Sequence, residues 1–219
     1  MVALQEAVFQ NRKHAAYLLG ERLMEYQNTD SVLVAVPSGG IHMGSYLSEL
    51  LNLPLDVIPC RKIRHPADPQ KTIGAVSIDS VVLPGVDRSL PQDYVYHQIQ
   101  LLQHVLDTQA RHYSAAHSFI SCEGKTIIIV DDLLMTGDTM LACIKALRQR
   151  KPEKIVVAVP NVTPAATELI SQSIDAIVYL TIEPNAAAHL YAEFPTISEE
   201  EVIEILQQRS AAMSSLTVL

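Results

Sequence analysis

Short aliphatic runs alternate along the chain with longer segments in which apolar residues recur every three or four positions. The strongest run is TIIIV at Thr126–Val130, a composition typical of a strand buried on both faces of a parallel sheet. The periodic segments, such as Arg12–Tyr26, are typical of amphipathic helices. The pattern predicts strands at 31–36, 55–58, 126–130, 155–159 and 176–180, and helices at 12–26, 41–51, 92–113, 138–150, 164–171 and 199–208.

This regular alternation predicts right-handed βαβ units. We therefore expect an α/β fold, a three-layer, doubly wound and mainly parallel sheet with helices on both faces. The alternation of strands and helices is interrupted at 61–92. Prolines and glycines there surround two short β-like runs at 73–78 and 81–83. We interpret 61–92 as a small β-containing hood on a single domain spanning 9–208, and we expect 209–219 to be a flexible tail.

Composition and charge narrow the class of protein. Of 219 residues, 48% are hydrophobic and 18% are charged, which favours a folded core over disorder. The net charge of -8 disfavours a surface that grips nucleic acid or an anionic membrane through its overall field, so we expect neither partner. No apolar run approaches the roughly 18 residues of a membrane span. Three widely spaced cysteines and a first segment without basic residues favour a cytoplasmic protein with reduced thiols.

Candidate chemistry gathers directly after the strand at 126–130, where the chain reads DDLLMTGDT from Asp131 to Thr139. Ligands of open α/β sheets bind at the carboxyl ends of the strands. Two adjacent carboxylates there cannot both enter the sheet without a large desolvation cost. The backbone N–H groups and hydroxyls that follow, at a helix start, can hold a phosphate. Acids beside such a loop suit a sugar phosphate, and an acid pair that caps the next helix is the structural alternative.

The segment IIIVDDLLMTGDTM resembles the 5-phosphoribosyl-1-pyrophosphate (PRPP) signature of type I phosphoribosyltransferases. Two further segments, VAVPSGG through GAV at 34–76 and LTIEPN through SEEEV at 180–202, resemble a group of predicted, poorly characterised bacterial phosphoribosyltransferases. With FQNRKHAAYLLGERL at 9–23, the likeness covers most of the chain between 9 and 208. No dinucleotide-binding Gly-x-Gly-x-x-Gly and no Gly-x-x-x-x-Gly-Lys motif competes with it.

The resemblance implies a set of residues around PRPP. Asp131 and Asp132 would bind the ribose hydroxyls, directly or through Mg²⁺, the one cofactor expected. The 5-phosphate would be held by the loop Met135, Thr136, Gly137, Asp138 and Thr139. The pyrophosphate would be received by Pro37, Ser38, Gly39 and Gly40, with a cis peptide bond expected at Pro37–Ser38.

Two cations complete the expected site. Arg61 and Lys62 directly follow the second strand, with Arg64 nearby, and are a candidate pyrophosphate clamp, although a solvated loop face would look the same. With the two acids they are the candidate catalytic residues. The implied reaction is displacement of pyrophosphate from the anomeric carbon by a nitrogen acceptor, under a hood that excludes water.

The sequence also departs from the group. Ser38 stands where the group has arginine, Gln70 where it has glutamate, and Asn185-Ala186 where it has Phe-Tyr, so a phosphate donor and a ring for stacking a base are missing. The leading hypothesis is a phosphoribosyltransferase with an unidentified small-molecule acceptor. A PRPP-sensing regulator with weakened catalysis is the alternative, and a hydrolase or phosphorylase of ribose phosphates is a third. His42 and His65 are further candidates for pyrophosphate contact, and the wider family suggests a homodimer.

Overall fold

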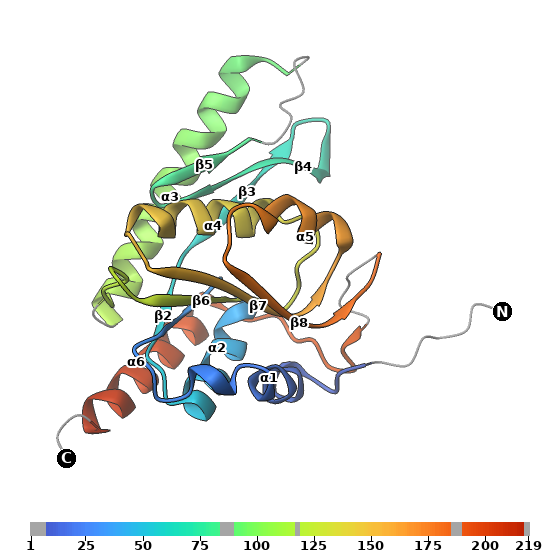
Figure 1. Cartoon of the computed structure of the whole chain (residues 1–219). Helices are drawn as coiled ribbons and strands as arrows, with labels where there is room; N and C mark the ends of the chain where they lie inside the picture. Colours follow the sequence, from blue (N-terminus) through green and yellow to red (C-terminus); the bar gives the residue numbers. More distant parts are fainter. Residues whose placement is uncertain (1–7, 84–89, 117–118, 185–189, 217–219) are drawn as a thin grey trace.

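A five-stranded parallel sheet forms the centre of the computed structural model (Figure 1), which describes residues 8–83, 90–116, 119–184 and 190–216. The strand order is β2-β1-β6-β7-β8, and every neighbouring pair is parallel. This confirms the predicted parallel sheet. Its strands are β1 (Val32–Ala35), β2 (Leu55–Val57), β6 (Thr126–Val130), β7 (Lys154–Val162) and β8 (Ala176–Ile182).

Helices cover both faces of this sheet (Figure 1). Strand alternation sends Ile128 and Val130 of β6 into one buried cluster and Ile127 and Ile129 into the other, which is why the strand is apolar throughout. The three predicted layers are therefore confirmed. The first cluster is covered by α1 (Arg12–Glu21), α2 (Gly39–Leu51) and α6 (Glu199–Leu216), and the second by α4 (Asp138–Gln149) and α5 (Pro164–Ser171).

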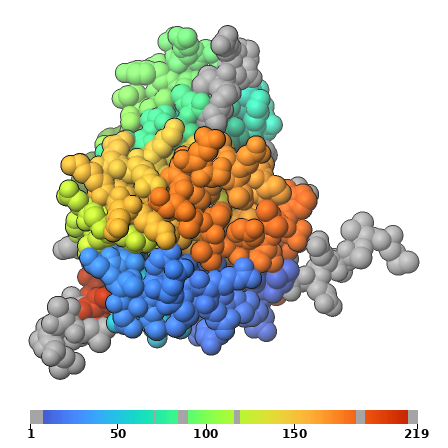
Figure 2. All heavy atoms as spheres, in the orientation of Figure 1, coloured from blue at the N-terminus to red at the C-terminus, as the bar shows by residue number. Residues whose placement is uncertain are grey.

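The predicted hood is a separate antiparallel sheet of order β3-β4-β5. Its inner face packs on the long helix α3, with Ile63 and Val76 against Val95 and Leu106. Figure 2 shows this sheet and α3 as a lobe standing on the layered body. The elements are β3 (Cys60–His65), β4 (Asp68–Ser77), β5 (Ser80–Val82) and α3 (Gln92–Ala116). Residues 84–89 of the predicted hood lie outside the described part of the chain.

Strand β3 adds an element that the sequence did not indicate. Arg61 and Lys62, predicted to follow the second strand directly, lie within β3 and pair with Val76 and Ala75 of β4. The residues CRKIRH gave no strand signal because Ile63 is the one aliphatic residue among them. Pairing with β4 therefore sets their conformation.

Two helix boundaries differ from the prediction by five residues or more. Helix α1 ends at Glu21 and is followed by the 3₁₀ helix η1 (Met24–Tyr26). Helix α6 continues through Leu216, so most of the expected tail 209–219 is helical, and 217–219 lie outside the described residues. The extension is anchored where Arg209 donates to the Ser48 hydroxyl of α2 over 3.2 Å. No helix in the described ranges is both long and apolar enough to cross a membrane.

Candidate functional site

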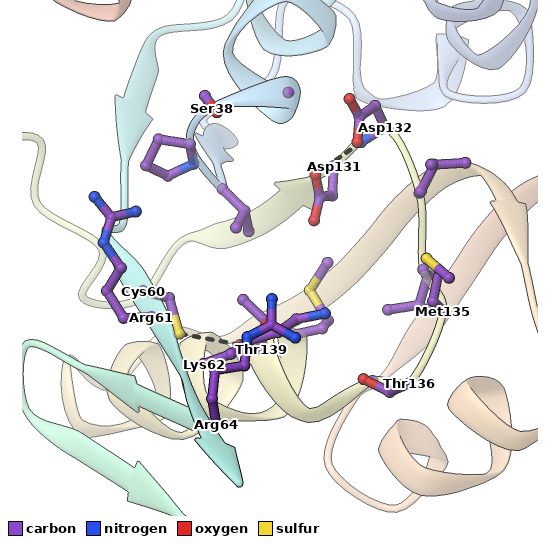
Figure 3. Close-up of a pocket in the computed structure, with 17 residues that line it drawn as sticks. Ser38, Cys60, Arg61, Lys62, Arg64, Asp131, Asp132, Met135, Thr136 and Thr139 are labelled. Carbon is purple, nitrogen blue, oxygen red and sulfur yellow. Dashed lines mark hydrogen bonds between the residues drawn. The ribbon is translucent and has the colours of Figure 1, made fainter. Parts of the chain in front are cut away.

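A cavity of about 420 Å³ opens at the carboxyl ends of β1 and β6, with β3 along its other side (Figure 3). Three stretches far apart in the sequence meet there, as the expected arrangement of strand ends requires. The predicted site residues that line it are Pro37, Ser38, Gly39, Arg61, Lys62, Asp131, Asp132, Met135, Thr136, Gly137 and Thr139, and Arg64 joins them. Gly40 and Asp138 do not belong to this lining set.

The loop after β1 is shaped by close contact with the end of β6. A cis peptide bond joins Pro37 to Ser38, as expected. A Cβ atom on Gly40 would lie 2.4 Å from the Val130 carbonyl oxygen, and one on Gly39 would lie 1.8 Å from Oδ2 of Asp132. The two glycines therefore allow the start of α2 to rest directly on the residues that follow β6.

The acid pair itself is asymmetric. Oδ1 of Asp131 accepts a hydrogen bond from the backbone N–H of Asp132 over 2.8 Å. Burial, and then the neighbouring Asp132 carboxylate, raise the pKa of Asp131 well above its usual value, while the charge of Lys62 opposes this. In Figure 3 the Asp131 side chain extends into the cavity. The Asp132 carboxylate lies against Gly39 instead, so the two acids offer different faces to a ligand.

Sequence reasoning missed the partner of Asp132. Arg12, at the start of α1, is 8% exposed, and its Nε donates to Oδ2 of Asp132 over 2.8 Å. Its Nη1 also donates to the Pro195 carbonyl over 2.7 Å, and its Cζ lies 3.8 Å from the centre of the Phe194 ring. Since Arg12 and Asp132 are 120 positions apart, no local spacing could have indicated the pair.

The loop from Met135 to Thr139 is pinned to the end of β7. Thr163 donates its hydroxyl to the Met135 carbonyl over 2.6 Å. Gly137 has a φ of +81°, a conformation that favours glycine, and from there α4 begins. The buried Oγ1 of Thr139 has no hydrogen-bond partner among the described residues. An unpartnered buried hydroxyl in a cavity wall is a feature that a ligand oxygen would satisfy.

The cations of β3 alternate along the strand. Burial, and then the charge of Glu199, raise the pKa of Tyr113 in α3 to about 12, and the charge of Arg61 opposes this rise. The charge of Lys62 instead opposes the rise in the pKa of Asp131. Figure 3 shows Arg61 extending from β3 in one direction and Lys62 and Arg64 in another. The expected clamp is thus divided between the two faces of one strand.

Other expected contributors lie elsewhere. His42 Nε2 lies 2.8 Å from Oε1 of Glu201, and His65 accepts from the Ala67 N–H; neither histidine is in the lining set. Tyr191, 5% exposed, donates to the Asp132 carbonyl over 2.9 Å and belongs to the core. Asn185-Ala186 and the side chain of Gln70 lie outside the described part of the structure.

Comparison with known proteins places most of this chain in one family. The model of the phosphoribosyl transferase domain matches residues 5–191. A Mycobacterium tuberculosis protein named "putative phosphoribosyl transferase" is 26% identical over 209 residues, which cover 92% of this chain and 47% of that protein. The chain thus spans about half the length of the curated relatives that it matches over most of its own length.

Two solved structures share the architecture. The protein TT1426 from Thermus thermophilus superposes with a TM-score of 0.77 at 29% identity, over 92% of this chain and 99% of its own. A purine phosphoribosyltransferase from Pyrococcus horikoshii superposes with a TM-score of 0.52 at 19% identity, over 89% of this chain and 99% of its own. The second likeness shows the fold alone.

Proposed function

Because this chain belongs to the phosphoribosyl transferase domain family, we propose that it binds PRPP with Mg²⁺ and transfers the 5-phosphoribosyl group to a small nitrogen acceptor, releasing pyrophosphate. One observation carries the proposal: a carboxylate, an unpartnered buried hydroxyl and the cations of β3 surround a single cavity. PRPP offers hydroxyls, a 5-phosphate and a pyrophosphate in one molecule. A cytoplasmic location belongs to this proposal, as does a homodimer.

The 5-phosphate would occupy the loop of Met135 to Thr139. Thr136 and Gly137 present backbone N–H groups at the start of α4, where the helix dipole favours an anion. The Thr139 hydroxyl would gain the acceptor that it lacks among the described residues. Asp138, buried in the first turn of α4, would contribute through its backbone N–H, because its carboxylate would repel the phosphate.

The ribose would lie over the acid pair. Asp131 would accept from one hydroxyl, and the oxygen of Asp132 that Arg12 does not take would accept from the next. Carboxylate oxygens are the ligands that Mg²⁺ prefers, and a cation beside Asp131 would offset the burial that raises the pKa of this group. When bound, Mg²⁺ supplies positive charge that neutralises the phosphate oxygens of the leaving group.

The pyrophosphate would lie between the loop Pro37–Gly40 and strand β3. Arg61 and Lys62 would stabilise the negative charge that develops on the leaving group, and they already stand on a rigid strand. Backbone N–H groups at the start of α2 add donors, and Gly39 lets the chain approach closely. Ser38 contributes a hydroxyl to the cavity where an arginine would have contributed a forked pair of donors.

Ser38 is also the observation that favours the second candidate, a protein that senses PRPP without efficient transfer. A single hydroxyl holds the leaving group less firmly than a guanidinium, which affects the transition state more than the binding of the sugar phosphate. Screening nitrogen nucleophiles for pyrophosphate release separates the two candidates. Release with one acceptor supports the transferase, and saturable PRPP binding without release from any of them supports the sensor.

Calorimetric titration with PRPP, with and without Mg²⁺, tests the binding itself. We expect saturable binding, strengthened by Mg²⁺, and its loss in the Asp131→Asn, Asp132→Asn double variant. The control is Asp30→Asn, which removes an exposed carboxylate paired with Lys125 far from the cavity and should leave the affinity unchanged. Absence of binding by the folded protein, or equal affinity in the double variant, would contradict the proposal.

A further inference from the structure

Arg12 is held by three different contacts that meet beside the cavity. Its Nε donates to Asp132, its Nη1 donates to the Pro195 carbonyl, and its guanidinium stacks on Phe194. The side chains of Arg12 and Asp132 are 9% and 10% exposed, so the ion pair is almost completely shielded from solvent. A planar, forked guanidinium can make these contacts at once, whereas the compact ammonium of lysine cannot.

The carboxylate of Asp132 is confined on its other side. Its Oδ2, the atom bonded to Arg12, lies where a Cβ of Gly39 would meet it at 1.8 Å. The Asp132 carbonyl accepts from the hydroxyl of Tyr191 over 2.9 Å, and the Tyr191 ring packs on Phe194 with centroids 4.8 Å apart. The direction of this carboxylate is therefore fixed by Arg12 from α1 and by the start of α2.

The segment that carries Arg12 is itself tied to the chain that follows β8. The backbone of Phe9 donates to Leu190 and accepts from Ala192, each over 2.9 Å, and Glu193 donates to Gln10 over 2.9 Å. Arg12 thus joins a short ladder, formed by residues 9–10 and 190–193, to the acid pair. The ladder thus reaches Asp132 by two routes, the guanidinium of Arg12 and the hydroxyl of Tyr191.

We infer that Arg12 is a positioning residue for PRPP: it holds Oδ2 of Asp132, with the carboxylate packed on Gly39, so that Oδ1 is left to accept from the ribose. The inference rests on the proposed function and deepens it. Arg12 is not in the set that lines the cavity, so its effect on a ligand passes through Asp132. Without Arg12, the carboxylate is free to turn and lies beside a second acid, Asp131, without compensation.

A double-mutant cycle measures whether the effect passes through Asp132. PRPP affinity, determined calorimetrically with Mg²⁺, and Tm are compared for wild type, Arg12→Met, Asp132→Asn and the double variant. We expect Arg12→Met to weaken PRPP binding about tenfold in wild type and less than about twofold in the Asp132→Asn background. Arg12→Lys, which keeps the charge and is more certain to fold, should weaken binding by an intermediate factor.

The matched control is Arg22→Met. Arg22 caps the other end of α1 and donates to the Tyr179 carbonyl of β8, so its removal also costs one arginine and one backbone contact. It should leave the PRPP affinity unchanged. Wild-type affinity in both Arg12 variants, or an equal loss in both backgrounds, would overturn the inference while leaving the proposed function standing. Failure of the folded wild-type protein to bind PRPP would instead overturn the proposed function and this inference with it.

Discussion

The two sides of the cavity are built by different physical means. On one side, the loops 37–40 and 131–139 rest on the buried parallel sheet and are fixed by an ion pair, by glycine contacts and by hydrogen bonds to β7. On the other side, the hood strand β3 presents Arg61, Lys62 and Arg64 from a small antiparallel sheet, partly or fully exposed. The first side fixes the positions of the groups that would contact a ligand, and the second side supplies positive charge.

This difference predicts two kinds of variant. Changes to the packed and ion-paired residues of these loops should alter stability and ligand affinity together, because the contacts that shape the site also belong to the core. Changes to the cations of β3 should alter affinity with little effect on the free energy of unfolding, since long exposed side chains contribute little to it. The following variants test this distinction.

Gly39→Ala is expected to have the largest effect. Its new methyl group would meet Oδ2 of Asp132 at 1.8 Å, and Arg12 prevents that carboxylate from moving aside. We expect a loss of about 1–3 kcal/mol in the free energy of unfolding, together with loss of measurable PRPP binding. Urea denaturation and calorimetry measure the two quantities.

Gly44→Ala, one turn further along α2, is the control for this variant. Its Cβ would meet the end of the Leu55 side chain at 2.7 Å, and a leucine methyl group can shift. We expect a smaller loss of stability and unchanged PRPP affinity. If both alanine variants bind PRPP as well as wild type does, the contact between the glycine loop and the acid pair has no role in the site.

Thr139→Val separates ligand binding from stability on the same side of the cavity. The substitution removes a hydroxyl that has no partner among the described residues, so the free energy of unfolding should stay constant or rise slightly. PRPP affinity should fall about tenfold, since a hydrogen bond to a charged phosphate is lost. Thr167→Val, which removes a hydroxyl bonded to the Thr163 carbonyl of α5, should leave the affinity unchanged. Equal affinities would contradict the assigned phosphate contact.

Lys62→Met tests the hood side. The charge of Lys62 acts on Asp131 and is available to the ligand, so its removal should weaken PRPP binding about fivefold, corresponding to roughly 1 kcal/mol. The free energy of unfolding should change little. Lys145→Met removes the same charge from the exposed side of α4 and serves as the control. A large loss of stability in Lys62→Met would contradict the division between the two sides of the cavity.

The sequence predicted the layered body far better than the cavity. Strand Thr126–Val130 has the predicted bounds because continuous burial on two faces leaves a continuous apolar run. The motif that follows it indicated the acid pair and the phosphate loop because both are local. By contrast, strand β3 depends on pairing with β4, and the Arg12–Asp132 pair depends on packing between the first helix and the end of β6. Neither the strand nor the ion pair produces a hydrophobic periodicity in the sequence segment that contains it.

Asp175 provides the smallest expected effect, at the edge of the sheet opposite the cavity. Its carboxylate accepts from the Ile155 N–H over 2.7 Å and from Arg148 over 2.6 Å, which lowers its pKa from the usual value of 3.8. A lowered pKa in the folded state means that the stabilisation is present above pH 3.8 and is lost as the pH falls through the folded value. Because the side chain is 40% exposed, Asp175→Asn should cost less than about 1 kcal/mol at neutral pH.

Thermal unfolding of wild type and Asp175→Asn between pH 7 and pH 3 measures this difference, and PRPP titration at neutral pH accompanies it. We expect the difference between the two Tm values to shrink as the pH falls below 3.8, since protonation of the wild-type carboxylate removes its advantage over the amide. PRPP affinity should be equal, because the ion pair with Arg148 lies on the sheet edge away from the strand ends that form the cavity. A weakened affinity here would mean that stability and binding are coupled throughout the layered body, not through the loops 37–40 and 131–139 in particular.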